Sequence, residues 1–206
     1  MSTTSPQDLE KVKRPSDAPG VEDLILRRWS PRAFSDKEVS ADNLKALFEA
    51  ARWAASSSNE QPWRFLVGRK GDPVYQKIFN SLVEFNQKWA VQAPVLIVSV
   101  AKKTFAKNGS QNAYNLHDTG AATATLALQA TASGMHAHHM AGFDRDQIRA
   151  SFAIPTDYEV GSATAVGYLG DPDTLSGTMR QNELAPRERK PLNEIVFSEW
   201  EKPAQF

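Results

Sequence analysis

The sequence predicts a single mixed domain in which helices alternate with short buried strands, and three observations lead to this fold class. A chain of 206 residues with 41% hydrophobic and 23% charged residues can bury one full core. Apolar residues recur at helical spacing in several segments that begin at capping residues. Short apolar runs that suit strands lie between these segments, and the sequence contains no internal repeat.

The first expected elements are two helices. Apolar residues at helical spacing predict a short helix over residues 21–29, which Pro31 stops. Ser40 is a suitable N-cap for a second helix over 41–55. The residues of its core-facing side are Leu44, Leu47, Phe48, Ala51 and Ala55.

A strand, a helix and a second strand follow. The segment RFLVGR predicts a strand over 64–69. Asp72 and Pro73 suit the cap and the first turn of a helix, which we expect over 74–93. The run PVLIVSVA, residues 94–101, has six apolar positions in eight and predicts a strand buried on both faces.

The remaining elements continue the alternation. An alanine-rich helix is expected from about residue 112 to 132, where Gly134 supplies the glycine that helix C-termini favour. A short strand is expected over 135–143. Asp144 then caps a brief helix, and a further buried strand is expected over 162–170.

Both ends of the chain are expected to lie outside this core. Residues 1–20 are polar and mixed in charge, so we expect a flexible N-terminal arm before a single domain over 21–206. Residues 171–186 predict a polar loop. The tail over 187–200 returns to apolar residues too late to build a core alone, so we expect it to pack on another surface, such as a second subunit.

Composition and charge exclude several classes of protein. The absence of cysteine excludes disulfide frameworks, thiolate nucleophiles, zinc fingers and cysteine-ligated iron–sulfur clusters. Lys plus Arg and Asp plus Glu both total 24, which does not indicate a nucleic-acid or membrane partner. No stretch approaches the roughly 20 apolar residues of a membrane span, and the N-terminus has no apolar signal region. We therefore expect a cytoplasmic protein.

Two basic segments and one polar segment suggest a binding site. In RRWSPRAF, Arg28, Ser30 and Arg32 alternate and form a donor-only surface suited to a phosphate. Arg187 and Arg189 alternate in the same way in RERKPL. Both segments have a simpler interpretation as solvated basic turns. The hydroxyl and amide groups of SSSNEQPW likewise suit helix capping as well as ligand binding.

Four segments together carry a resemblance to a known family. They are RRWSPRAF, ASSSNEQPWRFLV, HMAGFD and RERKPLNEIV, and they occur in the order and spacing of the flavin-dependent nitroreductases. The sequence resembles this family over roughly residues 21–200. The resemblance implies an α+β fold with a central mixed β-sheet flanked by helices. It also implies an obligate homodimer with one FMN in each of two interface clefts and with the C-terminal tail packed on the partner subunit.

The resemblance also implies roles for individual residues. The FMN phosphate would be held by Arg28, Ser30, Arg187 and Arg189, and Arg32 would lie nearer the ribityl chain or the pyrimidine edge. A flavin held mainly by the other chain would be reached by Ala55, Ser56, Ser57 and Asn59. The backbone of Met140, Ala141 and Gly142 would face the flavin ring, with the Ala141 N–H directed towards N5; the alternative is an ordinary strand-to-helix turn. A further flavin contact falls on Asn86 or Lys88.

Some positions depart from the family pattern. Trp29 stands where a smaller or basic residue is common, Ala55 where proline is frequent, and Ala141 where some relatives carry an acidic residue. None of these changes removes a phosphate donor. They leave the substrate preference open.

The activity that the resemblance implies is that of an FMN-dependent oxidoreductase. Such an enzyme takes hydride from NADH or NADPH and reduces nitroaromatics, quinones or similar small-molecule acceptors by a ping-pong mechanism. The cofactor carries the chemistry, so no catalytic side chain is expected. Two alternatives remain open: a related flavoprotein for reductive dehalogenation or flavin fragmentation, and a non-enzymatic FMN-binding dimer.

Histidines and serines offer further candidates. On a strand only His136 and His138 share a face, His139 lies on the other, and no carboxylate is close in sequence, so no metal site is expected. A hydrolase triad of Ser56 to Ser58 with His117 and Asp118 has no G-x-S-x-G turn, and neighbouring residues on a helix are expected to point apart. The tryptophans Trp53, Trp63 and Trp89 are expected in the core or at an interface.

Overall fold

A four-stranded sheet organises the part of the chain that the computed structural model describes, residues 5–15 and 18–205. Its strand order is β1–β2–β4–β3, and each pair is antiparallel. The strands are β1 (Trp63–Arg69), β2 (Val95–Lys102), β3 (His136–Met140) and β4 (Tyr158–Gly167). The α+β class is confirmed. The parallel pair that a mixed sheet requires is not found among the described residues of one chain.

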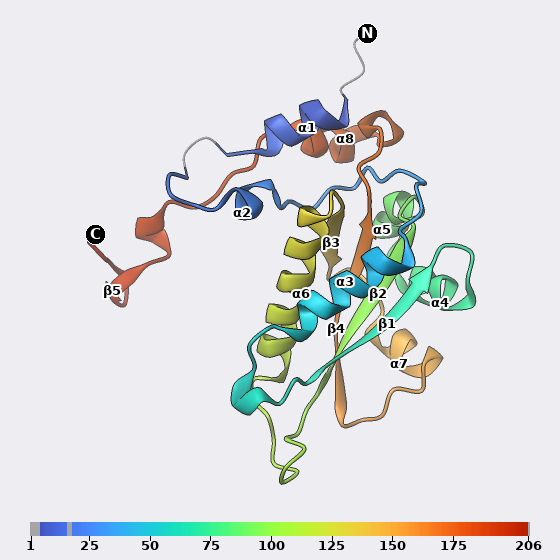
Figure 1. Ribbon diagram of the computed structural model, residues 1–206, viewed down its shortest axis with the longest axis vertical. Coiled ribbons are helices and arrows are strands. Elements are labelled where there is room, and N and C mark those ends of the chain that lie inside the picture. The colour runs from blue at the N-terminus through green and yellow to red at the C-terminus, as the bar shows by residue number, and fades with distance from the viewer. Residues whose placement is uncertain (1–4, 16–17, 206) are drawn as a thin grey trace.

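Helices cover both faces of this sheet (Figure 1). One face carries α3 (Ala41–Arg52) and α6 (Asn115–Ala132), and the other carries α4 (Pro73–Ser81), α5 (Glu84–Ala90) and α7 (Arg145–Ser151). Successive residues of β2 point to opposite faces, so Ile97 packs in the α3–α6 core and Leu96 in the other. A strand buried on both faces was expected here and is confirmed.

The helices with strong local signals form as expected. The Ser40 hydroxyl accepts the Asn43 N–H at 3.2 Å and begins α3. This helix ends at Arg52, so Ala55 lies in the following loop and not on the helix, where it was expected. The chain leaves α6 through Gly134, whose φ of 70° is a conformation that favours glycine.

The prediction of one helix over 74–93 is wrong, because two helices, α4 and α5, occupy this segment. Leu82 is extended between them and pairs with Phe143. The Val83 N–H donates to the Gly142 carbonyl at 3.1 Å. A tertiary partner more than fifty residues away therefore interrupts a segment whose local pattern is helical throughout.

The two ends of the chain contain more structure than expected. Helix α1 (Pro6–Lys13) occupies part of the expected flexible arm, where Leu9 is fully buried; residues 1–4 and 16–17 of that arm lie outside the described residues. Helix α8 (Gly177–Leu184) and the 3₁₀ turn Pro172–Thr174 occupy the expected loop, and α8 lies beside α1 (Figure 1). Helix α2 (Asp23–Arg27) is shorter than expected and has no buried residue of its own.

The tail extends away from the sheet (Figure 1). It contains a 3₁₀ turn (Leu192–Glu194) and a hairpin of β5 (Phe197–Glu199) and β6 (Lys202–Pro203). Its apolar side chains are exposed, and Trp200 is 85% exposed. In the described part of the chain, no helix has the length and apolar character needed to cross a membrane.

Candidate functional site

Three of the predicted phosphate donors lie together where α2 and the tail meet. Burial lowers the pKa of Arg28 below its usual value, and the nearby charge of Arg189 lowers it further. Burial, and then the charges of Arg28 and Arg189, lower the pKa of Arg187 in the same way. We call Arg28, Arg187 and Arg189 the arginine cluster. The two ends of the chain thus bring like charges together, as expected for an anion site.

Two members of the arginine cluster and the neighbouring Arg32 form no ion pair with a carboxylate among residues 5–15 and 18–205. Ion pairs occur elsewhere in the described residues, but none involves Arg28, Arg32 or Arg189. Arg28 Nη1 donates to the Ser30 hydroxyl at 3.4 Å. The Arg32 Nε is buried without a hydrogen-bond partner in the described structure. Arg189 Nη1 donates only to the neighbouring Glu188 carbonyl, at 2.7 Å, among the described residues. Positive charges without an ion pair fit an anionic group such as a phosphate.

Unlike Arg28 and Arg189, Arg187 binds the backbone of other segments of the chain. Its three side-chain nitrogens donate to the backbone carbonyls of Lys13, Leu26 and Arg28. The bond from Nη1 to the Arg28 carbonyl measures 2.6 Å. Arg187 therefore fastens the tail to α1 and to the turn that carries Arg28.

The predicted ring-side segment follows β3 and packs on α5. The Asn86 side-chain amide donates to the Gly142 carbonyl at 2.9 Å, whereas Lys88 pairs with Glu84 on the surface. A Cβ on Gly142 would lie 2.8 Å from Asn86 Nδ2 and 2.9 Å from Val83 Cγ2. The glycine is thus already required by packing against α5. Met140 is buried and Ala141 is exposed.

Arg32 connects the basic turn to this segment. Its guanidinium lies 5.9 Å from the ring centre of Phe85 on α5, next to Asn86. Through α5, Arg32 therefore lies close to the segment that contains Gly142.

The serine loop, residues 55–61, is held by Asp118, which sequence reasoning did not identify as a loop anchor. The Ser57 N–H donates to Asp118 Oδ2 at 2.9 Å, and the Gln61 N–H donates to the Ser56 hydroxyl at 3.0 Å. Ser58 and Asn59 have φ values of 53° and 56°, which non-glycine residues rarely adopt. Such conformations persist where surrounding bonds enforce them. Trp63 is buried after this loop as expected, whereas Trp53 before it is 76% exposed.

One chain does not bring the serine loop and the arginine cluster together. Ser57 is bonded to Asp118 in the first turn of α6. Next to Arg28, Trp29 packs on His136, with ring centres 5.7 Å apart, just after the other end of α6. At about 1.5 Å per residue, these two ends are about 20 Å apart. Figure 1 shows this separation along α6.

The three histidines of β3 serve packing in this structure. His138 Nδ1 donates to the Pro31 carbonyl at 2.8 Å, and His139 Nδ1 lies 2.8 Å from the Thr164 hydroxyl. Burial lowers the pKa of His136, His138 and His139 to about 4 in each case. No group of three or more potential metal ligands converges among the described residues. Trp29 lies between His136 and the Lys13 ammonium, which is 5.0 Å from its ring centre.

The expectation that His117 and Asp118 point apart is wrong. His117 Nδ1 lies 3.1 Å from Asp118 Oδ1, because the first turn of α6 lets the exposed imidazole turn back. The other carboxylate oxygen accepts the backbone N–H of Ser57, and no hydrogen bond joins a serine hydroxyl to this imidazole in the described residues.

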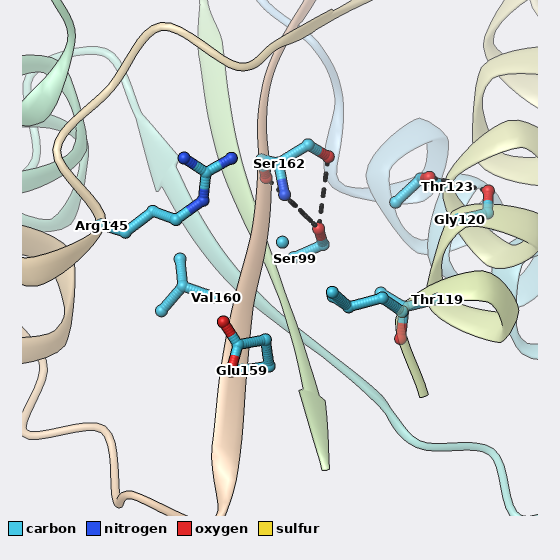
Figure 2. Close-up of a pocket in the computed structure, with 10 residues that line it drawn as sticks. Ser99, Thr119, Gly120, Thr123, Arg145, Glu159, Val160 and Ser162 are labelled. Atoms are coloured by element: carbon cyan, nitrogen blue, oxygen red, sulfur yellow. Dashed lines mark hydrogen bonds between the residues drawn. The ribbon is translucent and has the colours of Figure 1, made fainter. Parts of the chain in front are cut away.

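A cavity of about 310 Å³ lies between the sheet and the first turns of α6 (Figure 2). It is bounded by Ser99 of β2, by Glu159 and Ser162 of β4, by Thr119 of α6 and by Arg145. Figure 2 shows the bond that joins the Ser99 hydroxyl to the Ser162 N–H, at 2.9 Å, in its wall. None of the predicted site residues lines this cavity.

The fold and the donor set define an α+β protein with a site suited to a phosphate group. Residues 25–168 match the Nitroreductase family, and the chain belongs to this family. It is 28% identical over 154 residues to a putative NADH dehydrogenase/NAD(P)H nitroreductase of Archaeoglobus fulgidus, with 72% of this chain and 84% of the relative covered.

Solved structures show the same likeness. The chain is similar to a crystal structure described as an oxidoreductase containing FMN, with a TM-score of 0.84, 36% identity, and coverage of 90% of this chain and 94% of that one. A putative nitroreductase in complex with FMN from Desulfovibrio desulfuricans has a TM-score of 0.67 at 25% identity, with 85% and 94% covered.

Proposed function

We propose that this protein binds FMN and acts as an NAD(P)H-dependent oxidoreductase that reduces nitroaromatics, quinones or similar small acceptors. The observation that carries the proposal is the group of guanidiniums, Arg28, Arg32 and Arg189, which form no ion pair among the described residues. The FMN found in similar structures and the NAD(P)H named for relatives support it.

In this proposal the chain supplies binding and orientation, and FMN, when bound, supplies the hydride and electron transfer. Arg28, Ser30 and Arg189 hold the phosphate through charge-assisted hydrogen bonds. Arg187 keeps the phosphate-binding turn in place, because its nitrogens are already bonded to backbone carbonyls. Arg32 lies at the ribityl chain or the pyrimidine edge, where its positive charge favours negative charge on the ring.

The backbone of Met140, Ala141 and Gly142 faces the flavin ring in this proposal. Ala141 is exposed and Gly142 has no side chain, which supports it, because a flat ring can then approach this backbone closely. Asn86 fixes the loop through the Gly142 carbonyl. No side chain is assigned a proton-transfer role.

We propose further that two chains form a homodimer and complete each other's sites. The serine loop, with Ala55, Ser56, Ser57 and Asn59, is about 20 Å from the arginine cluster of its own chain and would reach the flavin of the partner. Exposed apolar side chains near this loop and on the tail, Trp53 and Trp200 among them, are typical of an interface. The tail would then pack on the partner subunit.

The test is an absorbance spectrum of the purified protein, followed by anaerobic addition of NADH and, separately, NADPH. Flavin bands that disappear with a nucleotide and return with a nitroaromatic or a quinone are expected, and the more effective nucleotide identifies the donor. A protein that neither contains nor binds FMN would overturn the proposal.

The same experiment separates the two alternatives. FMN binding without nucleotide oxidation for any acceptor indicates a non-enzymatic FMN-binding dimer. Turnover that releases halide from a halogenated aromatic, or that consumes the flavin itself, indicates dehalogenation or flavin fragmentation.

A further inference from the structure

A buried carboxylate lies directly behind the basic turn of the candidate site. Glu183 of α8 is 1% exposed, although glutamate is rarely buried without a partner. Its Oε1 accepts the backbone N–H of Arg32 at 2.8 Å and that of Ala33 at 2.9 Å. The carboxylate thus holds two adjacent N–H groups of a turn that is 150 residues away in sequence.

The segments that keep Glu183 in place come from the two ends of the chain. The Lys13 ammonium donates to the carbonyls of Asn182 and Ala185, at 2.7 and 2.5 Å, and so fixes the C-terminal end of α8. Leu9 anchors α1 beside it. Both helices lie outside residues 25–168, which match the family.

Burial disfavours the charged form of this carboxylate. Burial raises the pKa of Glu183, while the two N–H groups and the charges of Lys13 and Arg32 oppose that rise. A charge that must be desolvated is stabilised only if its hydrogen bonds are well made. An apolar side chain would fill the same space without this penalty but would leave the buried Ala33 N–H and the partly buried Arg32 N–H without this acceptor.

We propose that Glu183 is a positioning residue of the cofactor site: by accepting the Arg32 and Ala33 N–H groups, it fixes the turn and holds the Arg32 guanidinium beside Phe85 and the ring-side segment. The inference rests on the proposed function, because Arg32 is assigned to FMN. Glu183 itself touches no part of the proposed cofactor. Its effect on FMN binding passes through Arg32.

The test compares variants of the FMN-free protein by fluorescence titration with FMN. Glu183→Ala removes the acceptor, so the FMN dissociation constant should rise about tenfold or more, as expected for loss of hydrogen bonds made by a charged group. Glu183→Gln keeps an acceptor oxygen at the same reach and should stay within about threefold of the parent. Glu183→Asp keeps the charge but is one methylene shorter, so it should behave like the alanine variant.

A double-mutant cycle with Arg32→Ala tests whether the effect passes through Arg32. The double variant Glu183→Ala with Arg32→Ala should bind FMN no more weakly than Arg32→Ala alone, because the positioned group is already missing. The matched control is Glu38→Ala, which removes an exposed glutamate with no hydrogen bond or ion pair among the described interactions and should leave the dissociation constant unchanged.

The outcomes separate this inference from the proposed function. A parent protein that does not bind FMN overturns the proposed function. If the parent binds FMN and the Glu183→Gln and Glu183→Asp variants both bind FMN as tightly as the parent, the positioning role alone is overturned. Additive losses in the double-mutant cycle also overturn it, since they would mean that Glu183 acts independently of Arg32. If the alanine variant does not fold, the aspartate variant replaces it in the cycle.

Discussion

Arg28 and Arg189 combine two properties that a stabilising surface arginine does not have. They lie close to another guanidinium, and no ion pair engages them in the described residues. In Arg187 of the same cluster, each of the three side-chain nitrogens instead donates to a backbone carbonyl. Like charges held together without counter-charge lower stability unless a ligand offsets them, so the cluster favours an anion.

Replacing either Arg28 or Arg189, which form no ion pair among the described residues, should weaken FMN binding. Arg28→Ala or Arg189→Ala removes a charge-assisted phosphate contact of about 1.5 to 3 kcal/mol, which corresponds to a dissociation constant raised by about ten- to a hundredfold. Titration of the FMN-free protein measures this. The control is Arg69→Ala, an exposed arginine at the end of β1. Parent-like FMN affinity in both variants would remove the assignment.

Gly142 tests whether the ring-side segment depends on α5. Gly142→Ala places a Cβ within 3 Å of Asn86 and Val83, so the segment or α5 must shift. We expect a loss of about 1 to 3 kcal/mol in the free energy of unfolding, measured by urea denaturation. Gly120→Ala is the control, because its Cβ meets nothing and alanine favours a helix. Equal stability of the Gly142 variant and the parent would contradict this packing.

At the scale of the element, β3 carries three neutral histidines, of which His136 is buried and His138 and His139 are partly buried. Their folded pKa is about 4 against an ordinary value of 6.5, because burial disfavours the charged form. The unfolded chain therefore binds more protons between these values, and stability falls as pH decreases through this window. The contribution of the three neutral histidines to the free energy of unfolding is fully present above pH 6.5 and is lost progressively as the pH falls towards 4.

The pH dependence can be assigned to the strand by substitution. Urea midpoints at pH 7.5 and 5 should differ in the parent, with each histidine contributing roughly 1 to 3 kcal/mol over the full window. His139→Gln should reduce this difference, because a residue that does not titrate replaces one that must charge on unfolding. The control is His117→Gln, whose side chain is 77% exposed. An unchanged pH dependence in His139→Gln would contradict the explanation.

Elements with local signals could be predicted, and elements set by distant contacts could not. The Ser40 cap and the apolar spacing predict helix α3, and the apolar run predicts β2. The break before α5 could not be read from the segment itself, because its cause is the pairing of Leu82 with Phe143. For the same reason, nothing in the local sequence assigns α8 or its buried Glu183 to the site.

In the candidate site, too, local patterns could be predicted and contacts between distant residues could not. Alternating arginines in two segments gave the positions of the arginine cluster, since charge patterns are local. That Arg187 is occupied by three carbonyls, and that Asp118 holds the serine loop, depend on contacts between the ends of the chain and between separate elements.

At the scale of the whole molecule, the two predicted halves of the site lie at opposite ends of α6. If both halves serve one FMN, they must come from different chains. Assembly and FMN binding are then coupled, and each must strengthen the other by the same factor.

This coupling predicts that dilution to the monomer releases FMN. Sedimentation velocity, recorded at both protein and flavin absorbance, should show flavin only with the dimer. Excess FMN should shift the monomer–dimer midpoint to lower protein concentration.

Trp200→Ala removes an exposed anchor of the tail and should raise the dimer dissociation constant. It should also raise the FMN dissociation constant, measured at protein concentrations below the dimer midpoint. Lys70→Ala, a polar surface change at the far end of β1, should alter neither. A monomer that retains its full complement of FMN would mean that one chain holds the cofactor alone, so the serine loop would have to serve another purpose.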